Sequence, residues 1–427
     1  MVPPALMLIG GILLAHYFSG LSPRVWLWTM AACAAILSVL LLAKRDMVQR
    51  IVVLTTVLFC GLLGGFLCSM AEEHHWSRHC PDNAFLEVTL RETPSPGAKT
   101  YKTTAEVVGH SGDITLSFKK DSTSANLRYG DRLLIHGYPD TVRNTMYVTS
   151  IHYLLLDRDS ASLRARSEEF RIRLLHRMEQ GSLPAKLTGI VAALTLGWKA
   201  DLWPETKVAF RDAGIAHLLA VSGLHVGLLA YMAGLLLIWL GKDRRGRMMR
   251  GGVQVVVVWL FAMLTGMAPA TIRAALMFSL FIVSDITGRR TPKMNILAVA
   301  AIITLIGKPM LLFDTGWQLS YCAVAGIILA RPIITAFHNR IWQAANVSIA
   351  ATVATLPVTL LTFGRFHPYF LIANVIIIPF SAIILAFALL YMAMPCAITA
   401  WPLELVLNVT ECLTEWVASL PGAVIQW

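Results

Sequence analysis

Long apolar runs separated by short basic loops constrain the fold of this chain more than any other feature. A helix needs about 20 apolar residues to cross the hydrocarbon core of a membrane, and residues 2–18, 24–43 and 51–70 satisfy this. The chain is 56% hydrophobic and only 14% charged, whereas a soluble domain usually carries about 25% charged residues. These features predict a polytopic α-helical membrane protein with a soluble piece attached.

Apolar segments resume after residue 183 and continue to the C-terminus. Several are too short for a simple span, which predicts broken or re-entrant helices lining protein or water. With the first three runs they give about 10–11 membrane helices. The segments are Ile215–Leu240, Val253–Met267, Thr271–Ile286, Ile296–Ile306, Trp317–Ala330, Ala344–Phe363, Phe370–Met394 and Leu403–Leu420.

The basic loops predict how the chain is oriented. Residues 44–50 hold three cations, so this loop should lie in the cytoplasm and the third helix should emerge on the outer side. Basic residues recur at 242–250, 289–293 and 331–340, to which alternate spans return. The formal charge of +11 mostly fits this positive-inside pattern, although part of it could serve a polyanion. We expect a multi-pass protein of the cytoplasmic (inner) membrane.

Residues 71–158 have a different character, with short alternating runs separated by turn clusters. Five short strands in this region predict a small β-barrel, with an OB-like barrel as the economical choice. The predicted orientation puts this domain outside the cytoplasm. The expected strands are Phe85–Leu90, Lys102–Val108, Ile114–Lys119, Arg132–Gly137 and Tyr147–Leu155.

A basic amphipathic helix is expected next, in which arginines alternate with apolar residues. It could lie on anionic lipid at the membrane surface or form a collar for a nucleic-acid backbone. The predicted domains are residues 1–70, 71–158, 159–182 and 183–427. The arginines of the helix are Arg164, Arg166, Arg171, Arg173 and Arg177.

The segment most informative about chemistry is residues 211–227. It places His217, Ser222, Gly223 and His225 at the head of a predicted membrane helix. A Ser-Gly break lets the helix unwind and frees backbone N–H groups to meet an anion. Imidazoles at membrane depth are costly unless they face water or one another. The alternative interpretation is that these groups only form hydrogen bonds between packed helices.

A Ser/His hydrolase is also possible from the residue types in this segment. It lacks supporting parts, because there is no G-x-S-x-G elbow and no carboxylate obviously placed to orient a histidine. Asp201, Asp212 and Asp314 are candidates by proximity only. The sequence also has no P-loop, dinucleotide-binding fingerprint, CxxC pair or zinc motif, so we expect no cofactor, no metal and no ATP site.

Two further segments place polar residues inside apolar runs. Thr265 and Gly266 precede Arg273, and an intramembrane arginine is by default functional; it could contact phosphate or pair with an acid such as Asp285. Asp314 precedes a helix that carries Gln318 and Ser320, as an N-cap with two groups that could join helices. Further along, prolines and a polar residue inside spans predict broken helices around a polar interior: Pro357, Asn374 and Pro379.

These motifs, in this order, resemble the ComEC family of competence proteins, the membrane channels that pass single-stranded DNA into bacteria during transformation. The resemblance rests on residues 194–197, on the family's HLLAxSGLHV signature at 217–226, on 264–266 with 273–275, on 313–320, and on 354–357 with 363–364. The three N-terminal helices and the barrel also fit the family's layout.

The resemblance implies that one DNA strand follows a polar path lined by the signature residues. It also implies single-stranded DNA, an outer DNA receptor, a cytoplasmic ATP-driven helicase motor and membrane lipid as partners. The predicted channel and signature residues are His217, Ser222, Gly223, His225, Thr265, Gly266, Arg273, Asp314, Gln318, Ser320, Pro357 and Asn374. The predicted DNA-binding residues are Lys99, Lys102, Lys119, Lys120, Arg128, Arg132, Arg164, Arg166, Arg171 and Arg173.

Many family members continue into a C-terminal metallo-β-lactamase-like domain, and this chain ends at Trp427, about where that domain would begin. The resemblance therefore carries no nuclease activity onto this chain; either a separate nuclease supplies it or the chain is a shortened form. Two other function classes remain open. One is a secondary transporter or channel for a small anionic solute, and the other is a membrane-embedded hydrolase.

Overall fold

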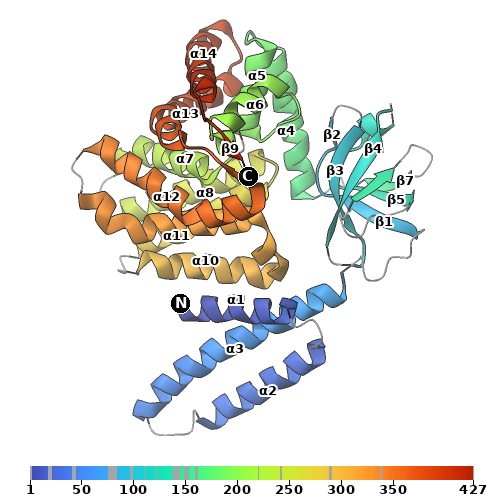
Figure 1. The fold of residues 1–427 in the computed structure, drawn as a ribbon, viewed down its shortest axis with the longest axis vertical. Helices are drawn as coiled ribbons and strands as arrows, with labels where there is room; N and C mark the ends of the chain where they lie inside the picture. The colour runs from blue at the N-terminus through green and yellow to red at the C-terminus, as the bar shows by residue number, and fades with distance from the viewer. Residues whose placement is uncertain are drawn as a thin grey trace. The chain divides into compact units, whose positions relative to one another are not determined.

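The computed structural model describes residues 2–17, 22–40, 45–75, 84–96, 100–110, 112–121, 123–137, 145–148, 153–158, 162–219, 221–240, 243–287, 291–336 and 339–426. These residues form mostly helices, together with one large sheet (Figure 1). The chain divides into two compact units. The first comprises residues 1–166 and 301–312, and the second comprises residues 167–300 and 313–427.

Three N-terminal helices belong to the first unit: α1 (Val2–Tyr17), α2 (Pro23–Leu40) and α3 (Arg45–Glu73). Glycines allow α1 and α3 to approach closely. A Cβ added at Gly11 would lie 1.7 Å from the carbonyl oxygen of Gly61, and one at Gly64 would lie 2.3 Å from that of Leu8. Small residues that let two backbones meet are typical of helix pairs in membranes.

The sheet of the first unit contains the predicted strands and some differences from them. It comprises β1 (Ala84–Leu90), β2 (Ser95–Pro96), β3 (Thr100–Val107), β4 (Asp113–Lys119), β5 (Asp131–Gly137), β6 (Thr145–Val148) and β7 (Tyr153–Arg158). The single strand predicted over Tyr147–Leu155 is wrong, because β6 pairs in parallel with β4 whereas β7 pairs antiparallel with β5. A segment predicted as a turn contains β2, which pairs with β3.

Among the described strands the sheet has the open order β6-β4-β3-β1-β5-β7, with β2 added at β3. The closed OB-like barrel therefore stays a prediction. Alternate residues along the strands form one core, in which Val88, Ile114, Phe118 and Leu133 are fully buried. This alternation follows from the period of two along a strand, which is why the sequence pattern located most strands correctly.

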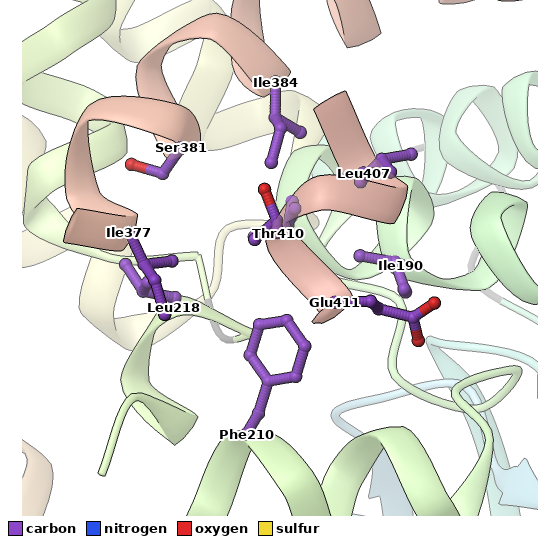
Figure 2. A pocket seen from close by; sticks show the side chains of 10 residues that line it. Ile190, Phe210, Leu218, Ile377, Ser381, Ile384, Leu407, Thr410 and Glu411 are labelled. Atoms are coloured by element: carbon purple, nitrogen blue, oxygen red, sulfur yellow. The ribbon is translucent and has the colours of Figure 1, made fainter. Parts of the chain in front are cut away.

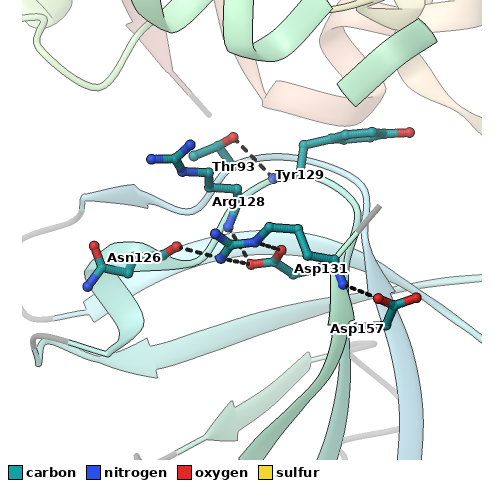
Figure 3. Close-up of polar contacts among 7 residues, drawn as sticks. Thr93, Asn126, Arg128, Tyr129, Asp131 and Asp157 are labelled. Carbon is teal, nitrogen blue, oxygen red and sulfur yellow. Dashed lines mark hydrogen bonds and ion pairs between the residues drawn. The ribbon is translucent and has the colours of Figure 1, made fainter. Parts of the chain in front are cut away.

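An ion pair joins the start of β5 to the end of β7 (Figure 3). The carboxylate of Asp131 is fully buried and accepts hydrogen bonds from Nε and Nη2 of Arg158, at 2.7 and 3.0 Å. It also accepts one from the backbone N–H of Arg128 at 2.9 Å. The hydrogen bonds to Asp131 raise the pKa of Arg158 above its ordinary value. This contact fixes the edge of the sheet.

The second unit is helical. Two stretches of its helices are assigned to the first unit: the start of α4, and the end of α10 with most of η6. The helices are α4 (Leu163–Glu179), α5 (Ala185–Leu196), α6 (Pro204–Asp212), η4 (Ala216–Leu218), α7 (Gly223–Leu236), η5 (Ile238–Leu240), α8 (Arg244–Leu264), α9 (Pro269–Ile286), α10 (Lys293–Gly307), η6 (Pro309–Phe313), α11 (Thr315–Ala336), α12 (Arg340–Phe363), α13 (Phe370–Ala393) and α14 (Ala397–Ser419). Two short strands, β8 (Arg365–Phe366) and β9 (Ile425–Gln426), pair with each other antiparallel.

Six helices in the described part of the chain are long and apolar enough to cross a membrane. They lie in α3, α8, α9, α11, α12 and α13, and shorter apolar helices include α1, α5, α7 and α10. By length and composition these helices are compatible with the predicted multi-pass membrane protein. The larger number of 10–11 membrane helices remains a prediction.

The predicted breaks in the helices are partly correct. The run Ile215–Leu240 is broken, because η4 precedes α7 and η5 follows it. The breaks expected at Pro357 and Pro379 are absent, since α12 and α13 run through both prolines. Within a membrane a proline is tolerated in a helix where hydroxyl side chains and neighbouring helices re-satisfy the backbone. Thr355 and Thr359 of α12 donate to the carbonyls of Ala351 and Thr355, whereas the carbonyl that Pro357 leaves without its helical N–H partner is that of Val353.

Candidate functional site

The head of α7 is organised by a hydrogen-bonded pair, Ser222 and His225. Ser222 is the N-cap, in extended conformation, and Gly223 is the first helical residue. The backbone N–H of Ser222 donates to Nδ1 of His225 at 3.2 Å, and the Ser222 hydroxyl lies 3.0 Å from the same nitrogen. This is a capping box in which histidine takes the place usually held by Glu or Gln.

The capping box also determines which nitrogen of His225 carries a proton. Nδ1 accepts a backbone N–H, so in the neutral ring the proton lies on Nε2. His225 is only 1% exposed, and within the described part of the chain its Nε2 has no hydrogen-bond partner. A buried N–H donor is therefore left unused at the head of α7. His217, by contrast, is exposed in η4.

Arg273 lies in the second turn of α9 and is 5% exposed. Its Nη2 donates to the hydroxyl of Ser320 at 3.1 Å, and its Nη1 lies 3.8 Å from Oδ2 of Asp314. The alternative pairing with Asp285 is not found. Asp285 is twelve residues further along the same helix, which at 1.5 Å per residue places it about 18 Å away.

Asp314 is the N-cap of α11, as the sequence predicted. Its Oδ2 accepts the backbone N–H of Trp317 at 2.8 Å, and its carbonyl oxygen accepts that of Gln318 at 3.0 Å. The hydroxyl of Ser320 donates to the carbonyl of Gly316 at 2.8 Å while it accepts from Arg273. The first turns of α11 therefore supply all the described polar partners of Arg273.

Thr265 and Gly266 form the turn between α8 and α9. Thr265 is 1% exposed and its hydroxyl donates to the carbonyl of Ala262 at 2.9 Å. Gly266 has φ +68°, a conformation that favours glycine. Helix α4 packs on this turn, because Nη1 of Arg171 donates to the carbonyl of Thr265 at 3.3 Å and the Ser167 hydroxyl donates to that of Met263.

Arg171 was predicted to face DNA, but its side chain is directed into the protein. It is 14% exposed, pairs with Glu168 at 3.0 Å and lies over the ring of Trp198 at 5.2 Å. Arg171 therefore attaches α4 to the turn at Thr265 and Gly266, through its hydrogen bond to the Thr265 carbonyl. On the same helix, Arg173 is exposed and pairs with Glu169.

The remaining predicted channel residues lie apart from this group. Asn374 is buried in α13, and its Oδ1 has no hydrogen-bond partner in the described part of the chain. Pro357 is exposed in α12. No described contact joins Asn374 or Pro357 to Arg273 or His225, so their roles remain predictions.

The predicted DNA-binding lysines of the sheet are brought together at one end of β3 and β4. Because Lys102 pairs with Ser117, Lys102 and Lys119 are diagonal neighbours on the same face. The ammonium group of Lys120 lies 5.7 Å from the ring centre of Tyr101. Lys102, Lys119 and Lys120 are exposed, and we call them the lysine cluster.

The other predicted basic residues are distributed differently. Arg132 is exposed but pairs with Glu87, and Arg164 lies over the ring of Tyr129 at 5.0 Å. Arg128 and Arg166 are exposed. Lys99 lies outside the described residues.

A hydrolase would need a serine in contact with a histidine and a carboxylate that orients the histidine. The described residues supply the first contact but not the second. Ser222 and His225 are in hydrogen-bond distance. Of the candidate acids, Asp201 accepts from the indole of Trp198, Asp212 from the guanidinium of Arg211, and Asp314 caps α11. No described contact joins any of the three to His225.

Sequence reasoning missed a second polar contact, beside an apolar pocket (Figure 2). Side chains from α5, α6, α13 and α14 line this pocket, among them Ile190, Phe210 and Ile377. At its rim the carboxylate of Glu411 pairs with Lys186 at 2.9 Å and accepts from the Thr206 hydroxyl at 3.2 Å. No motif links these three positions, since only the packing of α5, α6 and α14 brings them together.

Several known proteins are similar to this chain in sequence. The chain is 33% identical to ComE operon protein 3 of Bacillus subtilis over 198 residues, which is 46% of this chain and 25% of that protein. It is 29% identical to competence protein ComA of Neisseria gonorrhoeae over 151 residues, 33% of this chain and 21% of that protein. An uncharacterized Escherichia coli protein, YcaI, is 24% identical over 230 residues, 49% of this chain and 29% of that protein.

The aligned regions thus span about a quarter of the length of these relatives. No solved structure matches the chain. The family model described as competence protein matches residues 194–427, which is more than half of the sequence and includes α7, α9 and α11. By this match the chain belongs to the competence protein family.

Proposed function

We propose that this chain is an inner-membrane channel that passes single-stranded DNA into the cytoplasm during natural transformation. The observation that carries the proposal is a polar group in the competence region: buried His225 and Arg273 and half-buried Ser320 lie in the first two turns of α7, α9 and α11. Intramembrane ionisable residues are typical of substrate pathways. The competence protein family model covers this region, and one relative, ComA of Neisseria gonorrhoeae, is a competence protein by name.

The heads of these three helices meet in the second unit. A Cβ at Gly223 of α7 would lie 3.7 Å from that of Ala274 in α9, and a Cβ at Gly316 of α11 would lie 3.3 Å from Nη2 of Arg273. Helix N-termini carry a partial positive charge. Arg273 and these N-termini supply donors suited to a phosphate backbone, with the Asp314 carboxylate as the acid beside them.

The lysine cluster supports a DNA-binding role for the β domain, which we place outside the cytoplasm. Exposed cations that track a phosphate backbone are the usual basis of binding to single strands. Tyr101, beside Lys120, adds an aromatic ring at this end of the sheet. We propose that the strand contacts this domain, as an OB-like module, before it enters the membrane.

The proposal requires partners. The sequence contains no P-loop, so movement of the strand needs a cytoplasmic ATP-driven motor. A DNA receptor on the outer side would deliver the strand.

The test is uptake of labelled single- and double-stranded DNA into cells or motor-supplied proteoliposomes that contain this chain. Wild type, His225→Ala and Arg273→Gln would be compared at equal amounts of folded protein, with Lys207→Gln, at an exposed position of α6, as the control. We expect uptake to fall at least tenfold in the first two variants and to be unchanged in the control. If the folded wild-type protein admits no DNA with a motor present, the channel proposal is wrong.

A small-anion channel is the second candidate, because a buried arginine beside helix N-termini would also suit a small anionic solute. Uptake of labelled phosphate or sulfate without DNA uptake would favour it. A hydrolase would instead lose turnover on Ser222→Ala while transport stayed unaffected.

A further inference from the structure

Arg273 is a buried cation whose nearest carboxylate is held by another group. The side chain of Arg273 is 7% exposed, whereas that of Asp314 is 48% exposed. Their closest distance of 3.8 Å exceeds the range of a hydrogen bond. The carboxylate of Asp314 instead accepts the backbone N–H of Trp317 at 2.8 Å. Asp314 therefore neutralises Arg273 without being bound tightly to it.

Arg273 also keeps unused capacity to donate hydrogen bonds. A guanidinium has five N–H donors in a planar fork. Its described hydrogen bond goes to Ser320, and its buried Nε has no partner in the described part of the chain. His225, at the head of the adjacent α7, contributes a second unused and buried donor at Nε2. Buried donors of this kind normally have an acceptor, and the described residues do not supply one.

The chemistry of these donors points to an oxyanion. The guanidinium fork matches the oxygens of phosphate in a bidentate contact. Arg273 lies in the second turn of α9 and contacts the first turns of α11, and both helix N-termini favour negative charge. A phosphodiester can thus replace the Asp314 carboxylate at Arg273 without changing the net charge there.

We propose that Arg273 and Asp314 form a displaceable latch for backbone phosphates, in which each phosphodiester of a passing strand takes the place of Asp314 at Arg273. This inference rests on the proposed channel function. Asp314 remains attached to the head of α11 and returns when the phosphate leaves. Conduction needs sites that bind strongly enough to admit a ligand and weakly enough to release it, and competition by a tethered carboxylate supplies that balance.

The decisive variant is Asp314→Asn. Asparagine caps helices about as well as aspartate, so the head of α11 keeps its hydrogen bond while the competing charge is lost. Asp285→Asn is the matched control, because it removes an exposed carboxylate from the far end of α9. Both are made in a background in which the lysine cluster is changed to glutamine, so that binding to the β domain does not mask the latch.

Binding is measured by fluorescence anisotropy of a labelled oligothymidylate with the protein in zwitterionic nanodiscs. A methylphosphonate oligomer of equal length, which has no backbone charge, is the second probe. We expect Asp314→Asn to tighten phosphodiester binding about fivefold, with no change for Asp285→Asn or for the neutral oligomer. Arg273→Gln should weaken phosphodiester binding about tenfold, with Arg273→Lys between it and wild type.

Equal affinities for the two aspartate variants, or the same gain for the neutral oligomer, would overturn the latch. The Asp314→Asn comparison stands even if Arg273→Gln does not fold. Inorganic phosphate is added as a competitor, and displacement of the strand at equal concentrations of phosphate groups would point to a small-anion site. DNA uptake is measured in a separate experiment. If the variants change strand binding as expected but the wild-type protein takes up no DNA, the channel proposal is wrong and the latch is not.

Discussion

A Cβ added at Gly266 would lie 2.2 Å from Nη1 of Arg171. With no side chain at residue 266, the Arg171 guanidinium can lie directly against the turn between α8 and α9. This contact links the helix that follows the β domain with the turn that starts the Arg273 helix. It assigns a packing role to Arg171, a residue whose sequence context suggests nucleic acid or lipid.

Gly266→Ala should therefore destabilise the second unit. The residue would carry a Cβ at φ +68° and would displace the Arg171 guanidinium from Thr265, which together cost about 2 kcal/mol. Thermal unfolding in detergent measures the effect. Gly252→Ala in α8 is the control, since a Cβ there meets nothing within 4 Å, and it should leave the melting temperature unchanged or raise it slightly.

His225→Gln and His225→Ala should separate the capping role of His225 from its chemistry. Glutamine can still accept the Ser222 N–H in a capping box, so this variant should keep wild-type stability, whereas alanine should cost about 1 kcal/mol. Thermal unfolding gives the stability and DNA uptake gives the function. If glutamine restored uptake as well as stability, His225 would act only as a cap.

Asp131→Ala should destabilise the β domain by about 2–3 kcal/mol, because it removes a buried acceptor of three hydrogen bonds and leaves Arg158 without a carboxylate partner. Asp157→Ala, on the exposed face of β7, is the control. The stability of both variants is measured by the protease resistance and the thermal unfolding of the β domain. Equal losses in the two variants would contradict the assignment of Asp131 as the organising carboxylate.

The same ion pair has a predictable pH dependence on the alkaline side. The pKa of Arg158 is raised in the folded state, so the stability from its charge is complete below the unfolded-state pKa and is lost only above the raised folded value. Even an unperturbed arginine stays charged until strongly alkaline pH. The stability difference between wild type and Arg158→Gln should thus be constant from about pH 7 to about pH 10, as measured by denaturant unfolding.

Gly11→Ala should separate α1 from α3, because the added Cβ would lie 1.7 Å from the carbonyl oxygen of Gly61. Overpacking of this kind costs about 1–3 kcal/mol. The neighbouring Gly10→Ala is a close control, since a Cβ there meets nothing within 4 Å. Thermal unfolding should show a loss for the first variant alone, and equal melting temperatures would show that the two helices do not pack through Gly11.

Changing the lysine cluster to glutamine should weaken binding of single-stranded DNA and reduce its salt dependence. Each lost phosphate contact lowers the slope of log K against log salt by about 0.7 for a single strand, so three contacts predict a change of about 2. Arg132→Gln is the comparison, because Glu87 already neutralises that arginine. If it altered the slope as much as the lysines do, the lysine cluster would have no special role.

Local patterns in the sequence predicted much of the fold. Apolar length indicated the membrane helices, and alternation located β1, β3, β4 and β5 to within about two residues, because burial on one face repeats every second residue. The Ser222-Gly223 break and the Asp314 cap were also predictable, since capping chemistry depends on residues three apart. The family resemblance came from short ordered motifs of the same local kind.

The partners of the charged residues were decided only by tertiary structure. By sequence alone, Asp285 was as good a partner for Arg273 as any acid, and Arg171 resembled its exposed neighbours on α4. The packing of α11 against α9 selects Asp314, and the packing of α4 against the α8–α9 turn buries Arg171. Which helices meet depends on contacts between residues far apart in the chain, and no periodicity within a single helix contains that information.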